Sequence, residues 1–162
     1  MKRNKNPRTP EKEIQLIESG NVENNMAAIK VWAYTPKAQC HLMKPGHETI
    51  RDLYLKMRKP CAQFIAKAIS SGDRTLVKKA VVGSTLSKDN EAAFVRMFSD
   101  DIATIEEYLK ECPDGPYFLE TTMKVASELG IAKKLEEMVS RYTKQHHAST
   151  NLGDLLAAKL AS

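Results

Sequence analysis

The feature that most constrains the fold is a helical pattern of apolar residues between His47 and Asp73. Pro60 lies in this stretch and lacks a backbone N–H, so the pattern predicts two helices that are separated near the proline. Gly72 is expected to end the second helix, and Asp73 to cap the next one. The apolar residues recur at spacings of three and four, as on one face of a helix: they are Ile50, Leu53, Tyr54, Met57, Cys61, Phe64, Ile65 and Ala68.

Two upstream segments are expected to differ from this helical pattern. The first dozen residues are polar, carry two prolines and show no apolar stripe, which predicts a mobile basic arm that we place over 1–27. Residues 29–34 alternate apolar and polar side chains, which indicates a short strand. Two apolar patterns near the other end predict a C-terminal helical extension: Leu135, Met138, Val139 and Tyr142, then Leu152, Leu155, Leu156 and Leu160.

The composition fits one all-α, compact multi-helix domain in a chain of 162 residues with 42% hydrophobic residues. We expect an arm over 1–27, a basic helical segment over 28–72, a central region over 73–131 and C-terminal helices over 132–162, with 28–162 forming one domain. Three widely spaced cysteines argue against a disulfide framework and for a reducing, cytoplasmic location. No apolar run suggests a signal peptide or a membrane span.

Charge is distributed unevenly around a net value of +5. Residues 30–79 hold 11 basic and 3 acidic side chains, whereas residues 80–131 hold 4 basic and 10 acidic ones. A basic segment indicates a polyanionic partner such as a nucleic acid. The surface that binds this partner is expected mainly before residue 80. The alternative is that the two faces attract each other within the fold or between two copies.

Residues 76–131 contain several stretches typical of one family. The stretch "LVKKAVVGSTLS" leads into a small residue, Ala92, and then into Ile102, Ile105 and Glu106 in the order IxxIE. The stretch "LETTMKVASELGI" closes the region. In these features the segment resembles the lambda-repressor-like (Xre/Cro-type) helix-turn-helix family. It departs from the family at Arg96, which occupies the usual glycine position of the turn, so the turn is expected to differ.

Four short helices are expected in this region from its local signals. Asp73, Ser87 and Ser99 stand where N-caps are needed, and Gly83 and Gly130 stand where helices should stop. The resemblance predicts a shared core of ten residues: Val77, Val81, Leu86, Ala92, Val95, Ile102, Ile105, Val125, Leu129 and Ile131.

The resemblance also implies that the protein binds DNA and that the third helix of the motif contacts the bases. Carboxylates in that helix are unfavourable near phosphates, although an aspartate can accept a hydrogen bond from cytosine. The base-facing residues it implies are Ser99, Asp100, Asp101, Ala103 and Thr104. The phosphate contacts expected from nearby basic residues are Arg51, Lys56, Arg58, Lys59, Lys78, Lys79 and Lys88.

An enzyme is not expected, because no phosphate-binding glycine loop or nucleophile motif is present. We likewise expect no cofactor and no metal. The nearest metal-ligand set is Cys40, His41, His47 and Cys61, whose spacing is not that of a zinc finger. His146 and His147 are interpreted as exposed loop residues.

Two functions follow as expectations. The first is a DNA-binding transcriptional regulator of phage, plasmid or mobile-element type, acting as a homodimer on double-stranded DNA. The second is a helical protein-interaction adaptor whose acidic helix docks on a basic partner. Neither involves a membrane. The sequence does not specify the target site, the partner, or activation as opposed to repression.

Overall fold

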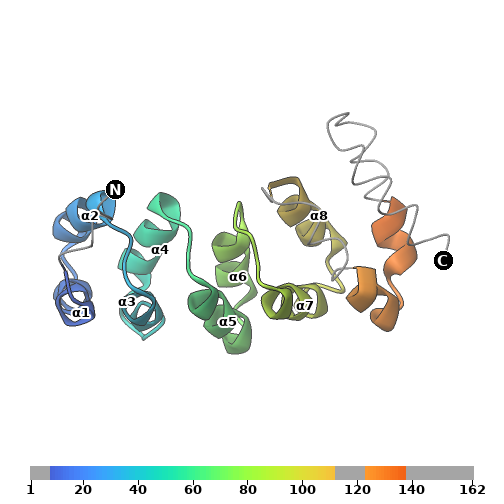
Figure 1. Cartoon of the computed structure of the whole chain (residues 1–162), viewed down its shortest axis with the longest axis horizontal. Helices are drawn as coiled ribbons and strands as arrows, with labels where there is room; N and C mark the ends of the chain where they lie inside the picture. Colours follow the sequence, from blue (N-terminus) through green and yellow to red (C-terminus); the bar gives the residue numbers. More distant parts are fainter. Residues whose placement is uncertain (1–7, 112–122, 138–162) are drawn as a thin grey trace, which may run out of the picture. The chain divides into compact units, whose positions relative to one another are not determined.

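The computed structural model describes residues 8–111 and 123–137, and the regular elements in these ranges are all α-helices (Figure 1). The predicted all-α class is therefore confirmed, and the described residues include no β-strand. Two further helical stretches follow the eight labelled helices, at 123–129 and 132–137. The labelled helices are α1 (Pro10–Ser19), α2 (Val22–Val31), α3 (Pro36–His41), α4 (Glu48–Met57), α5 (Ala62–Ser71), α6 (Arg74–Val81), α7 (Lys88–Met97) and α8 (Ile102–Glu111).

The chain forms two units, Met1–Gly72 and Asp73–Ser162. In the first unit, α1 packs against α3 and α3 against α5, while α2 packs against α4 and α1 also contacts α2. Figure 1 shows the odd-numbered helices of this unit in one layer and the even-numbered ones in the other. The stacked rings of Tyr34 and Tyr54, with centroids 5.5 Å apart, are part of the buried core of this unit.

The first helices of successive pairs begin 26 residues apart along the chain. Three of them follow a Thr or Ser whose side chain accepts the backbone N–H three residues later, whereas α5 follows Cys61, which makes no such bond. The caps are Thr9, Thr35, Cys61 and Ser87.

A glycine recurs with the same 26-residue spacing. Gly20, Gly46 and Gly72 have φ values of 65°, 94° and 76°, which residues with a Cβ rarely adopt. Gly20 and Gly72 directly end α1 and α5, and Asn21 and Asp73 after them cap the following helices. The described helices α1 to α7 therefore follow a 26-residue spacing of two helices per unit, a kind of repeat found in stacked helical proteins.

Helix α3 is shorter than its counterparts, with 6 residues compared with 10 in α1 and α5. Pro45 occupies the position that Ser19 and Ser71 hold in those helices, and it has no N–H to donate. The chain before it tightens, and the N–H groups of Met43 and Lys44 donate to carbonyls only three residues earlier. A turn at residues 42–47 thus replaces the last turn of the helix.

Aromatic side chains of α7 and α8 lie in the core of the second unit. Phe94 contacts Phe98 and Tyr108, with ring centroids 5.0 and 5.1 Å away. The Tyr108 hydroxyl accepts the backbone N–H of Leu86 at 3.3 Å, so the segment between α6 and α7 is held against α8. The Arg74 guanidinium lies over the Phe98 ring at 4.6 Å.

The helix boundaries predicted around Pro60 are confirmed. Helix α4 ends at Met57 and α5 begins at Ala62, Gly72 ends α5, and the Asp73 side chain caps α6. The predicted strand at 29–34 is wrong, because α2 continues to Val31 and buries Ile29 within a helix. Six residues of alternation are too few to outweigh the helix that starts at Val22 after its N-cap Asn21.

The arm expected over 1–27 is also wrong from residue 10 onward. Helices α1 and α2 occupy this range, and Glu13, Ile17 and Asn25 are buried in it. The start of the N-terminal segment and the C-terminal apolar residues from Met138 onward lie outside the described residues. No helix in the described part of the chain is long and apolar enough to span a membrane.

The predicted core of the central region is confirmed in part. Ala92, Ile102 and Ile131 are half-buried, and Leu129 is 37% exposed because it lies at the end of its helix before Gly130. Arg96 lies inside α7, with no left-handed residue needed there, and pairs with Glu128 at 2.7 Å. Six of the ten expected residues are buried, namely Val77, Val81, Leu86, Val95, Ile105 and Val125.

Candidate functional site

The two aspartates expected to face DNA bases form ion pairs with α6. Asp100 accepts two hydrogen bonds from the Arg74 guanidinium, at 2.6 and 3.2 Å. Asp101 lies 3.3 Å from the Lys78 ammonium. The Arg74 contact lowers the pKa of the Asp100 carboxyl below its ordinary value. Both carboxylates are therefore partnered within the second unit, by side chains that the sequence analysis did not connect to them.

Asp101 also forms the N-terminal cap of α8, a role predicted for Ser99. Its carboxylate accepts the Thr104 backbone N–H at 3.4 Å and the Thr104 hydroxyl at 2.7 Å, which lowers the pKa of Asp101. The prediction for Ser99 is wrong because the helix starts at Ile102, which makes Asp101 the flanking residue. Among the remaining residues expected to face bases, Thr104 is buried, Ser99 is half-buried and Ala103 is exposed.

The seven residues expected to contact phosphates are divided between the two units, with four in the first and three in the second. Arg58 donates to the backbone carbonyls of Ile29 and Lys30, at 3.0 and 3.1 Å, and so holds the end of α2. Lys78 pairs with Asp101, as described above. Arg51 is half-buried. The other four are exposed, namely Lys56, Lys59, Lys79 and Lys88.

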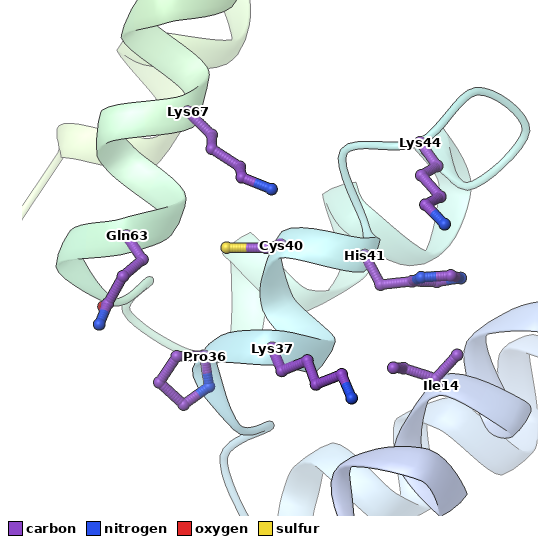
Figure 2. A pocket seen from close by; sticks show the side chains of 8 residues that line it. All are labelled: Ile14, Pro36, Lys37, Cys40, His41, Lys44, Gln63 and Lys67. Carbon is purple, nitrogen blue, oxygen red and sulfur yellow. The ribbon is translucent and has the colours of Figure 1, made fainter.

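A pocket of about 430 Å³ lies in the first unit, around the shortened helix α3. Figure 2 shows Lys67 extending from α5 toward the Cys40 sulfur, and Lys37 and His41 on the side of α3 that faces Ile14. Three lysines and one histidine surround it, and burial raises the pKa of the Cys40 thiol. The lining residues are Ile14, Pro36, Lys37, Cys40, His41, Lys44, Gln63 and Lys67.

The pocket combines apolar side chains with ammonium groups. Lys37 forms an exposed ion pair with Glu11 at 3.5 Å, which contributes little to stability and breaks at small cost. Lys44 and Lys67 are also exposed, one beyond the end of α3 and one on α5. A carboxylate or phosphate group that enters the pocket would therefore meet three positive charges supplied by two neighbouring helical pairs.

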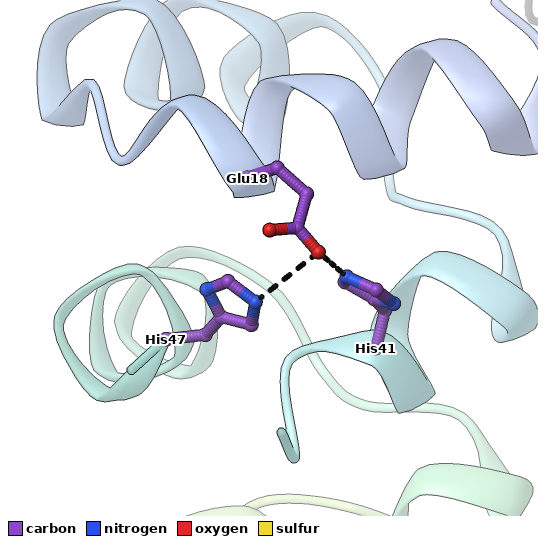
Figure 3. A group of neighbouring side chains, drawn as sticks. All are labelled: Glu18, His41 and His47. Atoms are coloured by element: carbon purple, nitrogen blue, oxygen red, sulfur yellow. Dashed lines mark hydrogen bonds and ion pairs between the residues drawn. The ribbon is translucent and has the colours of Figure 1, made fainter. Parts of the chain in front are cut away.

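A second cluster adjoins this pocket and shares His41 with it. Figure 3 shows Glu18, His41 and His47 pointing toward one another from three parts of the first unit. The Glu18 carboxylate oxygen lies 2.5 Å from His41 Nε2 and 3.6 Å from His47 Nε2. The hydrogen bond with His41 lowers the pKa of Glu18. Both histidine side chains are nearly buried, at 10% and 13% exposed.

Part of each cluster was predictable from the sequence. His41 and His47 were expected as possible ligands together with Cys40 and Cys61, whereas the structure places them with Glu18. The lysines of the pocket belong to the predicted basic segment but were not grouped, because Lys67 is far from Lys37 and Lys44 along the chain. The 26-residue repeat would have brought Lys67 near the helix that carries Lys37. Comparison with protein-family models, with curated proteins and with solved structures gave no match to this chain.

Proposed function

We propose that the chain is a protein-interaction module whose basic pocket around α3 binds an acidic segment of a partner protein. The observation that carries this proposal is that Lys37, Lys44 and Lys67 line one pocket of about 430 Å³. A volume of this size is within the range of small-ligand pockets and admits one or two side chains of a peptide. Recognition of acidic segments by clustered cations is a recurring mode of peptide binding.

The form of the pocket favours a peptide over duplex DNA. DNA presents its phosphates on the convex outside of a helix, where projecting protein side chains contact them. A concave pocket with apolar walls suits a side chain that projects into it, such as glutamate with its methylene groups. The proposal keeps the adaptor hypothesis but moves the docking surface, because Asp100 and Asp101 already pair with Arg74 and Lys78.

The DNA-binding regulator is the second candidate. The exposed side chains of Lys56, Lys59, Lys79 and Lys88 favour it, since exposed cations can neutralise the phosphates of a duplex. One set of variants tests both candidates.

The experiment compares two triple variants with the same change in charge. The pocket variant is K37Q/K44Q/K67Q, and the matched control is K30Q/K56Q/K59Q, in which all three positions are exposed and lie outside the pocket. Each removes three positive charges from a net charge of +5. Binding of a fluorescein-labelled polyglutamate peptide is measured by anisotropy at several salt concentrations, with a duplex DNA titrated in parallel.

The pocket variant is expected to bind the peptide about tenfold more weakly, because three exposed charge contacts of about 0.5 kcal/mol each sum to roughly one decade in affinity. The control should retain nearly the affinity of the unmodified chain. Equal losses in both variants would show diffuse charge attraction and would contradict the proposal. Tighter binding of DNA than of peptide at physiological salt, weakened by the control variant, would establish the second candidate instead.

A further inference from the structure

Three side chains that can ligate a metal converge in the first unit. Glu18 lies near the end of α1, His41 is the last residue of α3, and His47 directly precedes α4. One ligand atom of each lies within 4.8 Å of the others. The two imidazole rings are stacked, with centroids 5.2 Å apart and planes at 29°. The convergence depends on packing, because the three residues come from three helical elements.

The position of His47 in the repeat supports a ligand role. Asn21 and Asp73 occupy the equivalent position, and each side chain accepts the N–H that caps its helix. His47 makes no such bond, although it stands at the same place before α4. Its side chain points instead toward Glu18, so His47 does not cap α4 in the way that its counterparts cap their helices.

We propose that Glu18, His41 and His47 bind a divalent transition-metal ion of the zinc class. Neutral imidazole nitrogens and a carboxylate oxygen are ligands that zinc accepts, and three protein ligands leave a fourth position for water or another ligand. Tetrahedral zinc with bonds of about 2.0–2.2 Å separates its ligand atoms by roughly 3.3 Å. The 3.6 Å distance from Glu18 to His47 already fits, and the 2.5 Å contact with His41 would open slightly to admit the ion.

The surrounding charges set a limit on the expected affinity. Lys44 acts electrostatically on Glu18 and would repel a cation, whereas the carboxylate itself would be the one anionic ligand of the three. Neutralising this lysine should therefore strengthen metal binding. Metal affinity should thus rise when Lys44 is neutralised and fall when one of the three ligands is removed.

The test uses the full chain without a polyhistidine tag and with the substitutions H146N and H147N. These remove the only other histidines of the sequence as competing ligands. Zinc sulfate is titrated calorimetrically, and Co²⁺ is used as a coloured substitute whose visible spectrum reports coordination geometry. The variants are E18Q, H41N, H47N and K44Q, with C40S and C61S as controls for the alternative ligand set.

One ion per chain is expected, with a loss of at least about tenfold in affinity for E18Q, H41N and H47N. C40S and C61S should bind zinc like the background chain, and K44Q should bind it more tightly. Zinc should also raise the melting temperature of the background chain but not that of H41N. Circular dichroism shows whether each variant has folded, and E18Q changes an exposed side chain conservatively, so it tests the site even if H41N does not fold.

Absence of zinc binding in the background chain would overturn the proposal, as would binding that survives in both E18Q and H47N. Loss of binding in C40S or C61S would assign the ion to the cysteines instead. Peptide binding is measured without added metal, so these outcomes are separate from those that test the basic pocket.

Discussion

The buried carboxylate of Glu13 accepts the backbone N–H of Thr35 at 3.0 Å, and one repeat later Gln39 accepts the N–H of Cys61 at 2.7 Å. In each case the acceptor is the fourth residue of a first helix, and the donor is the N-cap of the first helix in the next pair. The bond therefore joins consecutive helical pairs at a constant sequence separation. Ile65 occupies the corresponding place in α5 and has no acceptor.

Substitution of Glu13 is expected to weaken the first unit. In Glu13→Ala the part-buried Thr35 N–H loses its acceptor and Arg8 loses a carboxylate 3.8 Å away, which predicts a loss of about 1–3 kcal/mol in the free energy of unfolding. Glu13→Gln should cost less, because Gln39 makes the same bond with an amide. Urea unfolding measures both, with the exposed Glu23→Ala as the control. A loss no larger than that of the control would show that the bond contributes nothing.

The core of the second unit gives a second prediction. Ile105 is fully buried in α8, so Ile105→Ala should lower the free energy of unfolding by about 2–5 kcal/mol through lost burial and the cavity left behind. Leu129→Ala removes an aliphatic side chain that is 37% exposed and should cost clearly less. Chemical denaturation of the two variants makes the comparison. Similar costs would contradict the burial described for these helices.

Sequence patterns predicted the helices where one apolar face was long. The stretch from Ile50 to Ala68 is such a case, and Pro60 divided it as expected. The repeat was missed because the core positions change identity from one copy to the next: Glu13, Gln39, Ile65 and Glu91 are equivalent and share only burial. What persists is the glycine between the helices in the first three copies and a Thr or Ser before three of the four first helices. These signals are weak singly, and only their spacing makes them informative.

The candidate sites were less predictable than the helices, because each is assembled by packing. His41 and His47 are close in sequence and were noticed, whereas Glu18 is on another helix and was not. Asp100 and Asp101 were identified as acidic and interpreted as base readers. Their partners Arg74 and Lys78 precede them by more than 20 residues, so no local pattern indicated the ion pairs.

The Asp100 ion pair predicts a dependence of stability on pH. The pKa of this carboxyl is lowered in the folded chain, chiefly by the Arg74 hydrogen bonds, from an ordinary value of 3.8. The unfolded state therefore binds a proton more readily, so the pair contributes stability above pH 3.8 that is lost as the pH falls below it. Asp100→Asn should reduce the acid-induced fall in melting temperature. An unchanged pH profile in this variant would show that the pair is too exposed to matter.

The last prediction separates a structural arginine from a phosphate contact. Arg58 donates to the carbonyls of Ile29 and Lys30 at the end of α2, where a cation also interacts favourably with the helix dipole. Arg58→Ala should therefore lower the free energy of unfolding by about 1–3 kcal/mol, whereas Lys56→Ala, at an exposed position on α4, should change it little.

The two variants are compared by urea unfolding and by titration of duplex DNA at several salt concentrations. A phosphate contact would appear as a salt dependence lowered by about one unit of slope, with stability unchanged. If Arg58→Ala lowers the salt dependence and leaves stability unchanged, Arg58 contacts nucleic acid, and this outcome supports the DNA-binding regulator. If the Arg58→Ala variant instead unfolds more easily, and its DNA binding falls only in proportion to the fraction of folded protein, the role of Arg58 is structural. The side chain then serves to connect the end of α2 to the end of α4.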